Sequence, residues 1–485
     1  MQTKYWIKRW LSLVALFAIS GCASVNFDYL KTTSFVLPDT ASTYLGSHVG
    51  DVIIDKPAGY SGFYPLSDGV DALAARLLLI DRAEVSIDVQ YYLINSDQVG
   101  NSFVLALLRA ADRGVRVRLL LDDIMAGNYD VGMQALDAHP NFEMRVFNPF
   151  NRGAAGRSLG ALGNFSRINR RMHNKSVTVD NQITIIGGRN MANHYFGADE
   201  KKKYGDLDVA GIGPVVNDVS TMFDEYWNHY YSLPVQAVAK APEDPQAELR
   251  RLRAALEKAH KRIADSVYAK VLEERYYGYL HNDDSIFEWS PYEFVYDSPD
   301  KSEKAKAGEA PSITTGLIEA LRAAKDEVII VSPYFVPRKS GIEGFSALEA
   351  RGVDVTVITN SLAANNQFAV HAGYAPARKP LLKNGIELYE VRPDANVSGS
   401  EFVAYSGATA TLHTKAFLVD EQSVFIGSFN FDPRSININT EMGVIIHDPK
   451  MATAFTQALF ASLPNETYEV FLNDNGKVRW RGSRG

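Results

Sequence analysis

One short pattern occurs twice in this sequence. Residues 173–180 read HNKSVTVD, and residues 413–420 read HTKAFLVD. In both copies the histidine is followed, at identical spacing, by a lysine, an aspartate, a glycine and an asparagine. Two full copies with the same spacing indicate a duplicated unit. The residues concerned are His173, Lys175, Asp180, Gly187 and Asn190 in the first copy, and His413, Lys415, Asp420, Gly427 and Asn430 in the second.

The segments that precede each copy also repeat. Residues 113–117 match residues 351–355 at nearly the same offset as the two histidines. Helix-like segments alternate with short apolar runs typical of strands, which predicts an α/β layered fold with buried sheets. The predicted helices cover residues 70–83, 103–113 and 318–324, and the predicted strands cover residues 85–92, 115–121 and 328–331.

The geometry of a strand explains why each motif suits phosphate chemistry. Residues 175–179 and 415–419 are predicted strands, and alternation places each histidine on the same face as the lysine two positions later, ~6.6 Å away. Both side chains can therefore reach one phosphate group. A turn after each motif aspartate then returns the chain, so that the glycine-rich loop and its asparagine lie beside the same face.

The residue types divide the chemistry between them. Imidazole can attack phosphorus and form a covalent intermediate, and a second imidazole can supply the proton that a leaving alkoxide needs. Lysine and amide groups stabilise charge on the other phosphate oxygens. Each histidine also needs a partner for its second ring nitrogen. The candidates are Asp206 and Glu441, with Asp208 as an alternative to Asp206. The two copies therefore predict one shared site. No metal centre is predicted, because the single cysteine and the scattered histidines give no set with zinc-ligand spacing.

The double His-x-Lys-x4-Asp pattern with its trailing Gly-x-x-Asn resembles the phospholipase D superfamily over roughly residues 60–465. Residues 61–66, 169–173 and 431–435 resemble bacterial cardiolipin synthases of the C-type branch more closely. The resemblance implies two α/β/α sandwich lobes related by a pseudo-twofold axis, with one active site at their interface and no cofactor. It also implies transfer of a phosphatidyl group to phosphatidylglycerol.

The resemblance assigns a role to each motif residue. It implies that His173 is the nucleophile and His413 the general acid. Asp180 and Asp420 are counted with the catalytic motifs, although such aspartates more often have structural roles. Gly188 departs from the family pattern, which often has serine there and so gains one hydrogen bond. The phosphate binders implied by the resemblance are Lys175, Asn190, Lys415, Ser428 and Asn430.

The first 22 residues predict export and lipidation. Lys4, Lys8 and Arg9 precede an apolar run at residues 10–19, which is too short to cross a membrane. Small residues then lead to Cys22, the only cysteine of the chain. This pattern resembles a bacterial lipoprotein signal at residues 1–21. It predicts a lipidated Cys22 and a location on the periplasmic face of the inner or outer membrane.

The rest of the chain divides by composition and periodicity. Residues 22–60 are polar and predict an extended tether. Within the linker, residues 247–271 predict an amphipathic helix and residues 300–310 a mobile loop. Asn475-Gly476 predicts a terminal hairpin. The expected boundaries are residues 61–235 for the first lobe, 236–311 for the linker, 312–465 for the second lobe and 466–485 for the hairpin.

Charge and motif together leave several functions open. The net charge of −7 argues against a protein devoted to nucleic acid, because such proteins normally carry a basic surface. The leading hypothesis is a phosphatidyltransferase of the cardiolipin synthase type, with phospholipid substrates and an unidentified accessory protein left open. The alternatives are a phospholipase D that releases phosphatidic acid, a nuclease of the same superfamily and a non-catalytic lipid-binding protein.

Overall fold

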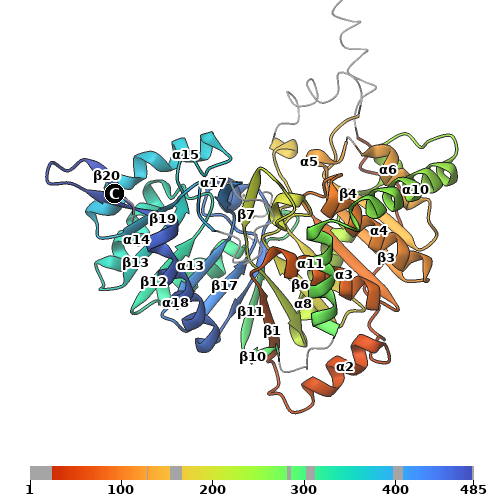
Figure 1. The fold of residues 1–485 in the computed structure, drawn as a ribbon, viewed down its shortest axis with the longest axis horizontal. Coiled ribbons are helices and arrows are strands. Elements are labelled where there is room, and N and C mark those ends of the chain that lie inside the picture. The colour runs from red at the N-terminus through yellow and green to blue at the C-terminus, as the bar shows by residue number, and fades with distance from the viewer. Residues whose placement is uncertain are drawn as a thin grey trace, which may run out of the picture.

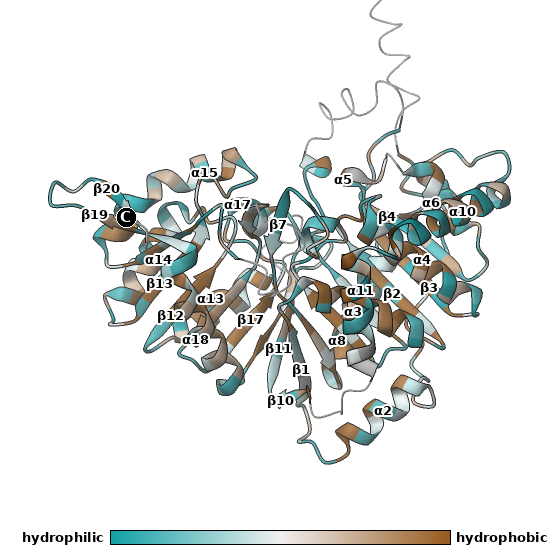
Figure 2. Cartoon of the chain, viewed as in Figure 1, coloured by the Kyte–Doolittle hydropathy of each residue, from teal (hydrophilic) through white to brown (hydrophobic). Residues whose placement is uncertain are grey.

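The structure, a computed structural model, describes residues 25–127, 129–152, 166–280, 286–301, 312–396 and 408–482. Two lobes lie side by side, each built on a nine-stranded sheet (Figure 1). Hydrophobic residues concentrate on the strands of both sheets, and the loops and the outer helix α10 (Pro245–Ile263) are mostly hydrophilic (Figure 2). Both lobes therefore bury their sheets, as the alternation of helices and apolar strands predicted.

The first sheet is mixed. Strands β2, β3 and β4 run parallel to one another, and the remaining neighbours pair antiparallel. In sheet order its strands are β10 (Glu288–Ser290), β1 (Ser61–Leu66), β8 (Asp208–Ile212), β6 (Ile183–Gly187), β5 (Ser176–Val179), β2 (Ser86–Tyr91), β3 (Arg116–Asp122), β4 (Phe142–Phe147) and β9 (Ser232–Pro234).

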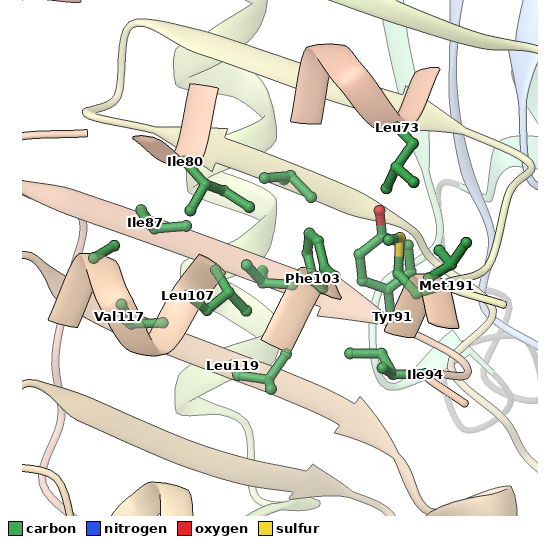
Figure 3. Close-up of a cluster of buried hydrophobic side chains, with 14 of the residues drawn as sticks. Leu73, Ile80, Ile87, Tyr91, Ile94, Phe103, Leu107, Val117, Leu119 and Met191 are labelled. Carbon is green, nitrogen blue, oxygen red and sulfur yellow. The ribbon is translucent and has the colours of Figure 1, made fainter. Parts of the chain in front are cut away.

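Helices cover both faces of this sheet. Because neighbouring strand residues point to opposite faces, Leu119 packs with α3 (Gly69–Arg82) and α4 (Gln98–Asp112), whereas Leu120 packs with α8 (Pro214–Asn228). Figure 3 shows the first of these layers, in which side chains of α3 and α4 meet those of β2 and β3. The first lobe is thus an α/β/α sandwich.

The second sheet repeats this plan. Its strands from β18 to β14 follow the same order as those from β8 to β4 in the first sheet, which confirms the duplication. In sheet order its strands are β11 (Tyr292–Tyr296), β18 (Met442–Ile446), β17 (Ser423–Gly427), β16 (Ala416–Val419), β12 (Glu327–Val331), β13 (Asp354–Asn360), β14 (Glu387–Val391), β19 (Thr467–Leu472) and β20 (Val478–Arg481).

Helices again lie on both faces of the second sheet. Ile330 packs with α13 (Ile313–Ala323) and α14 (Arg338–Glu349), and Val331 packs with α18 (Pro449–Glu466). The α8 and α18 layers belong to one continuous apolar cluster that crosses between the lobes. Shorter elements are α2 (Tyr44–Ile53), α5 (Asp123–Ala126), α6 (Asp130–Asp137), η1 (Asn193–Tyr195), β7 (Lys202–Gly205), α9 (Val235–Val238), α11 (Val267–Leu280), α15 (Phe368–Tyr374), η3 (Ala375–Ala377), α16 (Arg378–Lys383), β15 (Thr409–Leu412) and α17 (Pro433–Asn437).

The linker contains more regular structure than the sequence predicted. Instead of one helix over residues 247–271 it forms α10 and α11, with a break at residues 264–266. It then adds an edge strand to each sheet, since β10 pairs with β1 and β11 pairs with β18. The linker therefore joins the two sheets directly. The predicted mobile loop falls mostly on residues 302–311, which lie outside the described residues.

The N-terminal segment is not the extended tether that its composition predicted. The Lys31 ammonium donates to the Ser232 carbonyl at 2.7 Å, and the Val36 amide donates to the Asp224 carboxylate at 2.8 Å. Residues 44–53 form α2, which Thr43 caps by accepting from the Gly46 amide. Long-range contacts with the first lobe, which composition does not encode, hold this segment. The predicted signal peptide and Cys22 lie outside the described residues.

The predicted C-terminal hairpin is confirmed. Strands β19 and β20 pair antiparallel across the Asn475-Gly476 turn, and Gly476 takes a positive φ of 66°. Strand β19 also pairs with β14, so the hairpin extends the second sheet. Among the helices that the structure describes, none is long and apolar enough to cross a membrane.

Candidate active site

The backbone around each motif histidine is bound to the opposite lobe. The His173 amide donates to the Thr440 carbonyl at 2.9 Å, and the Thr440 amide donates to the Arg171 carbonyl at 3.0 Å. In the other direction the His413 amide donates to the Gly205 carbonyl at 2.7 Å, and β15 pairs in parallel with β7. These crossed pairings bring the two motif copies to one place at the lobe junction.

Each histidine side chain also meets a carboxylate of the opposite lobe. Nδ1 of His173 lies 2.8 Å from Oε2 of Glu441, and Nδ1 of His413 lies 2.5 Å from Oδ2 of Asp206. Both carboxylates are buried. An imidazole that donates Nδ1–H to a carboxylate keeps its lone pair on Nε2. Both predicted partners therefore lie where they can orient the rings.

The two motif lysines lie deep in the same site. Lys175 and Lys415 are each 1% exposed. Nζ of Lys175 donates to the His173 carbonyl at 2.5 Å, and Nζ of Lys415 lies 3.8 Å from Oδ2 of Asp206. Burial lowers the pKa of Lys175 to about 7 and that of Lys415 to about 8. An anion placed between them would raise both pKa values, because it favours the charged ammonium forms.

The charge states of the histidines and their partners follow from the same burial. Burial, together with the neighbouring Lys415, lowers the pKa of His413 to about 3, and burial also lowers that of His173. Burial raises the pKa of Asp206, but Lys415 and His413 outweigh it and bring that pKa to about 2. At neutral pH two neutral imidazoles thus face two ionised carboxylates, and each Nε2 carries a lone pair.

The motif asparagines complete this polar lining. Asn190 and Asn430 are 3% and 4% exposed, and the Oδ1 atom of each finds no hydrogen-bond partner among the described residues. Buried amides normally satisfy their hydrogen bonds, so each Oδ1 is available to accept from a donor on a ligand, such as a hydroxyl group. Within the described part of the chain, no cluster of His, Cys, Asp and Glu is arranged to hold a metal ion.

Asp180 and Asp420, which were counted with the catalytic motifs, bind backbone amides of their own lobes. The Asp180 carboxylate accepts from the backbone amides of residues 84–86, at 3.0, 2.8 and 2.9 Å. Asp420 accepts from the amides of residues 325–327 in the same way. Both lie at the ends of β5 and β16 away from the histidines. Seven residues of extended chain separate each aspartate from its motif histidine and carry it out of the site.

The departure at Gly188 has a steric explanation. A Cβ atom on Gly188 would lie 2.1 Å from Oδ1 of Asp206, so no side chain fits there. In the other half, Ser428 occupies the matching position and its hydroxyl donates to Glu441 at 2.5 Å. The hydrogen bond expected from a serine is therefore absent in the first half, and the Asp206 carboxylate takes up its space instead.

Aromatic residues that the motif did not reveal surround both rings. The Tyr92 ring meets His173 edge-on at 5.1 Å, and the Tyr195 ring meets His413 edge-on at 4.9 Å. Tyr204 stacks on His413 at 5.6 Å and meets the Tyr195 ring edge-on at 5.1 Å. The motif itself points to none of these three tyrosines. The one sequence feature that could have pointed to Tyr195 is its position, five residues after the motif asparagine.

Comparison with known proteins agrees with this geometry. A family model described as "Cardiolipin synthase, PLD-like domain" matches residues 77–227 and 317–462. The chain is 40% identical to cardiolipin synthase C of Escherichia coli (strain K12) over 425 residues, which cover 87% of this chain and 89% of that protein. It is 24% identical to a cardiolipin synthase of Staphylococcus aureus (strain Mu50) over 403 residues, 82% of this chain and 66% of that one.

The fold has a relative among solved structures. The crystal structure of phosphatidylserine synthase from Haemophilus influenzae Rd KW20 superposes with a TM-score of 0.57, covering 87% of this chain and 91% of that one. Sequence identity between the two is 13%, so the similarity is one of fold.

Proposed function

Because this chain belongs to the family of cardiolipin synthases with phospholipase D-like domains, we propose that it transfers a phosphatidyl group from one phospholipid to a hydroxyl group of another. The observation that carries this proposal is the pairing of His173 with Glu441 and of His413 with Asp206 across the lobe junction. It supports a single site with two imidazoles, one that attacks phosphorus and one that transfers the proton.

In the first step the donor lipid loses its headgroup. Nε2 of His173 attacks the phosphorus atom, and a phosphorus–nitrogen bond forms as the bond to the headgroup oxygen breaks. His413, protonated on Nε2 in the complex with the anionic phosphodiester, gives that proton to the departing oxygen. The products of this step are a headgroup alcohol and a phosphatidyl group bound to His173.

In the second step the acceptor lipid takes the phosphatidyl group. His413, now neutral, removes the proton from an acceptor hydroxyl, whose oxygen attacks phosphorus as the bond to His173 breaks. In both steps, charge on the phosphate oxygens is stabilised by the ammonium groups of Lys175 and Lys415 and by the amide N–H groups of Asn190 and Asn430. Ser428 does not fit its predicted role as a phosphate binder, because its hydroxyl donates to Glu441 and its amide donates to the Met442 carbonyl. When phosphatidylglycerol is the acceptor, the product is cardiolipin, and water in its place would give phosphatidic acid.

The N-terminus supports a membrane location for this chemistry. We infer that residues 1–21 are a lipoprotein signal and that Cys22 carries the acyl chains, since an apolar run there ends in small residues and a cysteine. Two or more acyl chains give stable anchoring, which would keep the site beside its lipid substrates on the periplasmic face. Replacement of Cys22 by alanine should release the protein from the membrane fraction.

Lipid analysis tests the proposed function. A cardiolipin-deficient bacterial host would express the wild type, His413→Ala and His447→Ala, the last removing an exposed histidine bound to Glu293 far from the site. Cardiolipin is expected with the wild type and His447→Ala and not with His413→Ala. Purified enzyme on defined lipids then separates the reactions. Phosphatidic acid as the main product would favour hydrolysis, and cleavage of DNA with no lipid product would overturn the proposal.

A further inference from the structure

The two site histidines differ in what lies beside Nε2, their reacting nitrogen. The hydroxyl of Tyr195 lies 3.5 Å from Nε2 of His413, and it accepts a hydrogen bond from Nδ2 of Asn190 at 3.0 Å. Tyr195 is 5% exposed, so its hydroxyl has little access to bulk solvent. With one lone pair taken by Asn190, the hydroxyl proton is free to point at the Nε2 lone pair of His413.

His173 has no such neighbour. Tyr92 meets its ring only edge-on, and no side chain among the described residues lies within hydrogen-bond distance of Nε2. The position that matches Tyr195 in the second copy, five residues after the motif asparagine, is Ser435. Its hydroxyl donates to Oε1 of Glu441 at 2.7 Å and so supports the carboxylate behind the ring. The two copies of the motif therefore differ in the surroundings of Nε2, the nitrogen that reacts.

From this asymmetry we propose that Tyr195 is the positioning residue that decides the division of labour between the histidines. Its hydroxyl engages the Nε2 lone pair of His413, which leaves His173 as the imidazole with a lone pair free to attack phosphorus. The proposal rests on the covalent mechanism above and adds to it. It explains on physical grounds why two equal motifs need not compete for the nucleophilic step.

His413 has two groups beside Nε2, the Tyr195 hydroxyl at 3.5 Å and the Lys415 ammonium at 3.4 Å. Its Nδ1 faces Asp206 at 2.5 Å and Lys415 at 2.6 Å, Tyr204 stacks on its ring, and Lys175 lies further off in the same site. The Nδ1 proton goes to Asp206, and the Lys415 ammonium also donates to the His413 carbonyl, so the Tyr195 hydroxyl is the uncharged donor beside Nε2. The Tyr204 hydroxyl is bound to Asn366 at 3.0 Å and turns away from the histidine. Tyr204 is therefore a matched control.

Trapping of the phosphoenzyme tests the proposal. Wild type, Tyr195→Phe and Tyr204→Phe, each as the full chain in detergent micelles, would be quenched in alkali during turnover of donor lipid labelled at phosphorus. Phosphatidylglycerol and phosphatidylethanolamine serve as donors in separate runs. Peptide mass spectrometry then locates the label. Tyr195→Phe should raise the fraction of label on His413 by up to roughly tenfold, the size expected from one lost hydrogen bond.

Each distribution of label between the two histidines either supports or contradicts the proposed role of Tyr195. Label on His173 in the wild type and in Tyr204→Phe, with label shared by His413 in Tyr195→Phe, supports the assignment. Label confined to His173 in Tyr195→Phe overturns it and leaves the proposed function intact. Label on both histidines of the wild type likewise overturns it. If the wild type forms cardiolipin but carries no label on either histidine, the covalent step and the assignment both fail.

Discussion

The carboxylate of Glu441 lies 2.8 Å from Nδ1 of His173, although the two residues belong to different lobes and stand 268 positions apart in sequence. The crossed pair of Asp206 with His413 repeats this arrangement. Each lobe therefore supplies a histidine and the group that orients the histidine of the other lobe. Neither lobe alone contains an oriented imidazole, which explains why a duplicated chain has one site.

Exchange of Glu441 for glutamine should inactivate the enzyme without unfolding it. The amide keeps the shape of the carboxylate but can present an N–H to Nδ1, which moves the ring proton to Nε2 and removes the nucleophilic lone pair. We expect kcat to fall by roughly 10²–10⁴ with little change in KM. The matched control is Glu293→Gln, which alters an exposed carboxylate bound to His447. Equal losses in the two variants would contradict an orienting role for Glu441.

Oxyanion binding should weaken as pH rises. The pKa values of about 7 for Lys175 and about 8 for Lys415 mean that both ammonium groups lose their protons between neutral and alkaline pH. An anion binds the protonated forms, so the shift in Tm that tungstate produces should shrink between pH 6 and pH 9. Lys175→Met should reduce the shift at pH 6 and flatten its pH dependence. A shift that stays constant over this range would contradict the assignment.

Acid should destabilise the fold below the ordinary pKa of histidine. Since burial depresses the pKa of His413 from 6.5 to about 3, the unfolded chain binds more protons within this window. Stability therefore falls as pH drops from 6.5 toward 3, by about 1.4 kcal/mol per pH unit for each such group within its window. Urea unfolding at several pH values measures the slope, which should be smaller for His413→Gln than for His447→Gln.

Asp180 should matter for stability rather than for chemistry. Its buried carboxylate satisfies three backbone amides at the start of β2, and alanine would leave them without partners. We expect Asp180→Ala to lower the free energy of unfolding by roughly 3 kcal/mol. Any folded fraction should retain a normal KM for lipid. Asp420→Ala should cost less, because its site is more exposed to water. Full stability with lost turnover in Asp180→Ala would restore a catalytic role.

A side chain at Gly188 should displace Asp206. Since a Cβ atom would lie 2.1 Å from Oδ1 of that carboxylate, Gly188→Ala forces Asp206 away from His413. We expect kcat to fall by roughly 10-fold to 100-fold, as when an orienting contact is lost at an otherwise intact site. Ser428→Ala, which deletes one hydrogen bond to Glu441, provides the comparison and should cost less than tenfold. Normal kcat in Gly188→Ala would show that Asp206 tolerates the shift.

The sequence by itself determined the local features of this protein. Strand periodicity placed His173 and Lys175 on one face, and the repeated order of segments predicted two similar α/β lobes. The Asn475-Gly476 turn predicted the terminal hairpin, which the structure confirms. These features depend on residues close together in the chain, and their spacing encodes them directly.

Only the tertiary structure decided which groups meet across the lobes. It paired Glu441 with His173, bound the Asp180 carboxylate to the amides of residues 84–86 and brought Tyr195 to Nε2 of His413. It also bound residues 31–36 to the first lobe, where polar composition had predicted a tether. Such contacts join residues far apart in the chain, and they depend on how two buried surfaces pack, which no local spacing records.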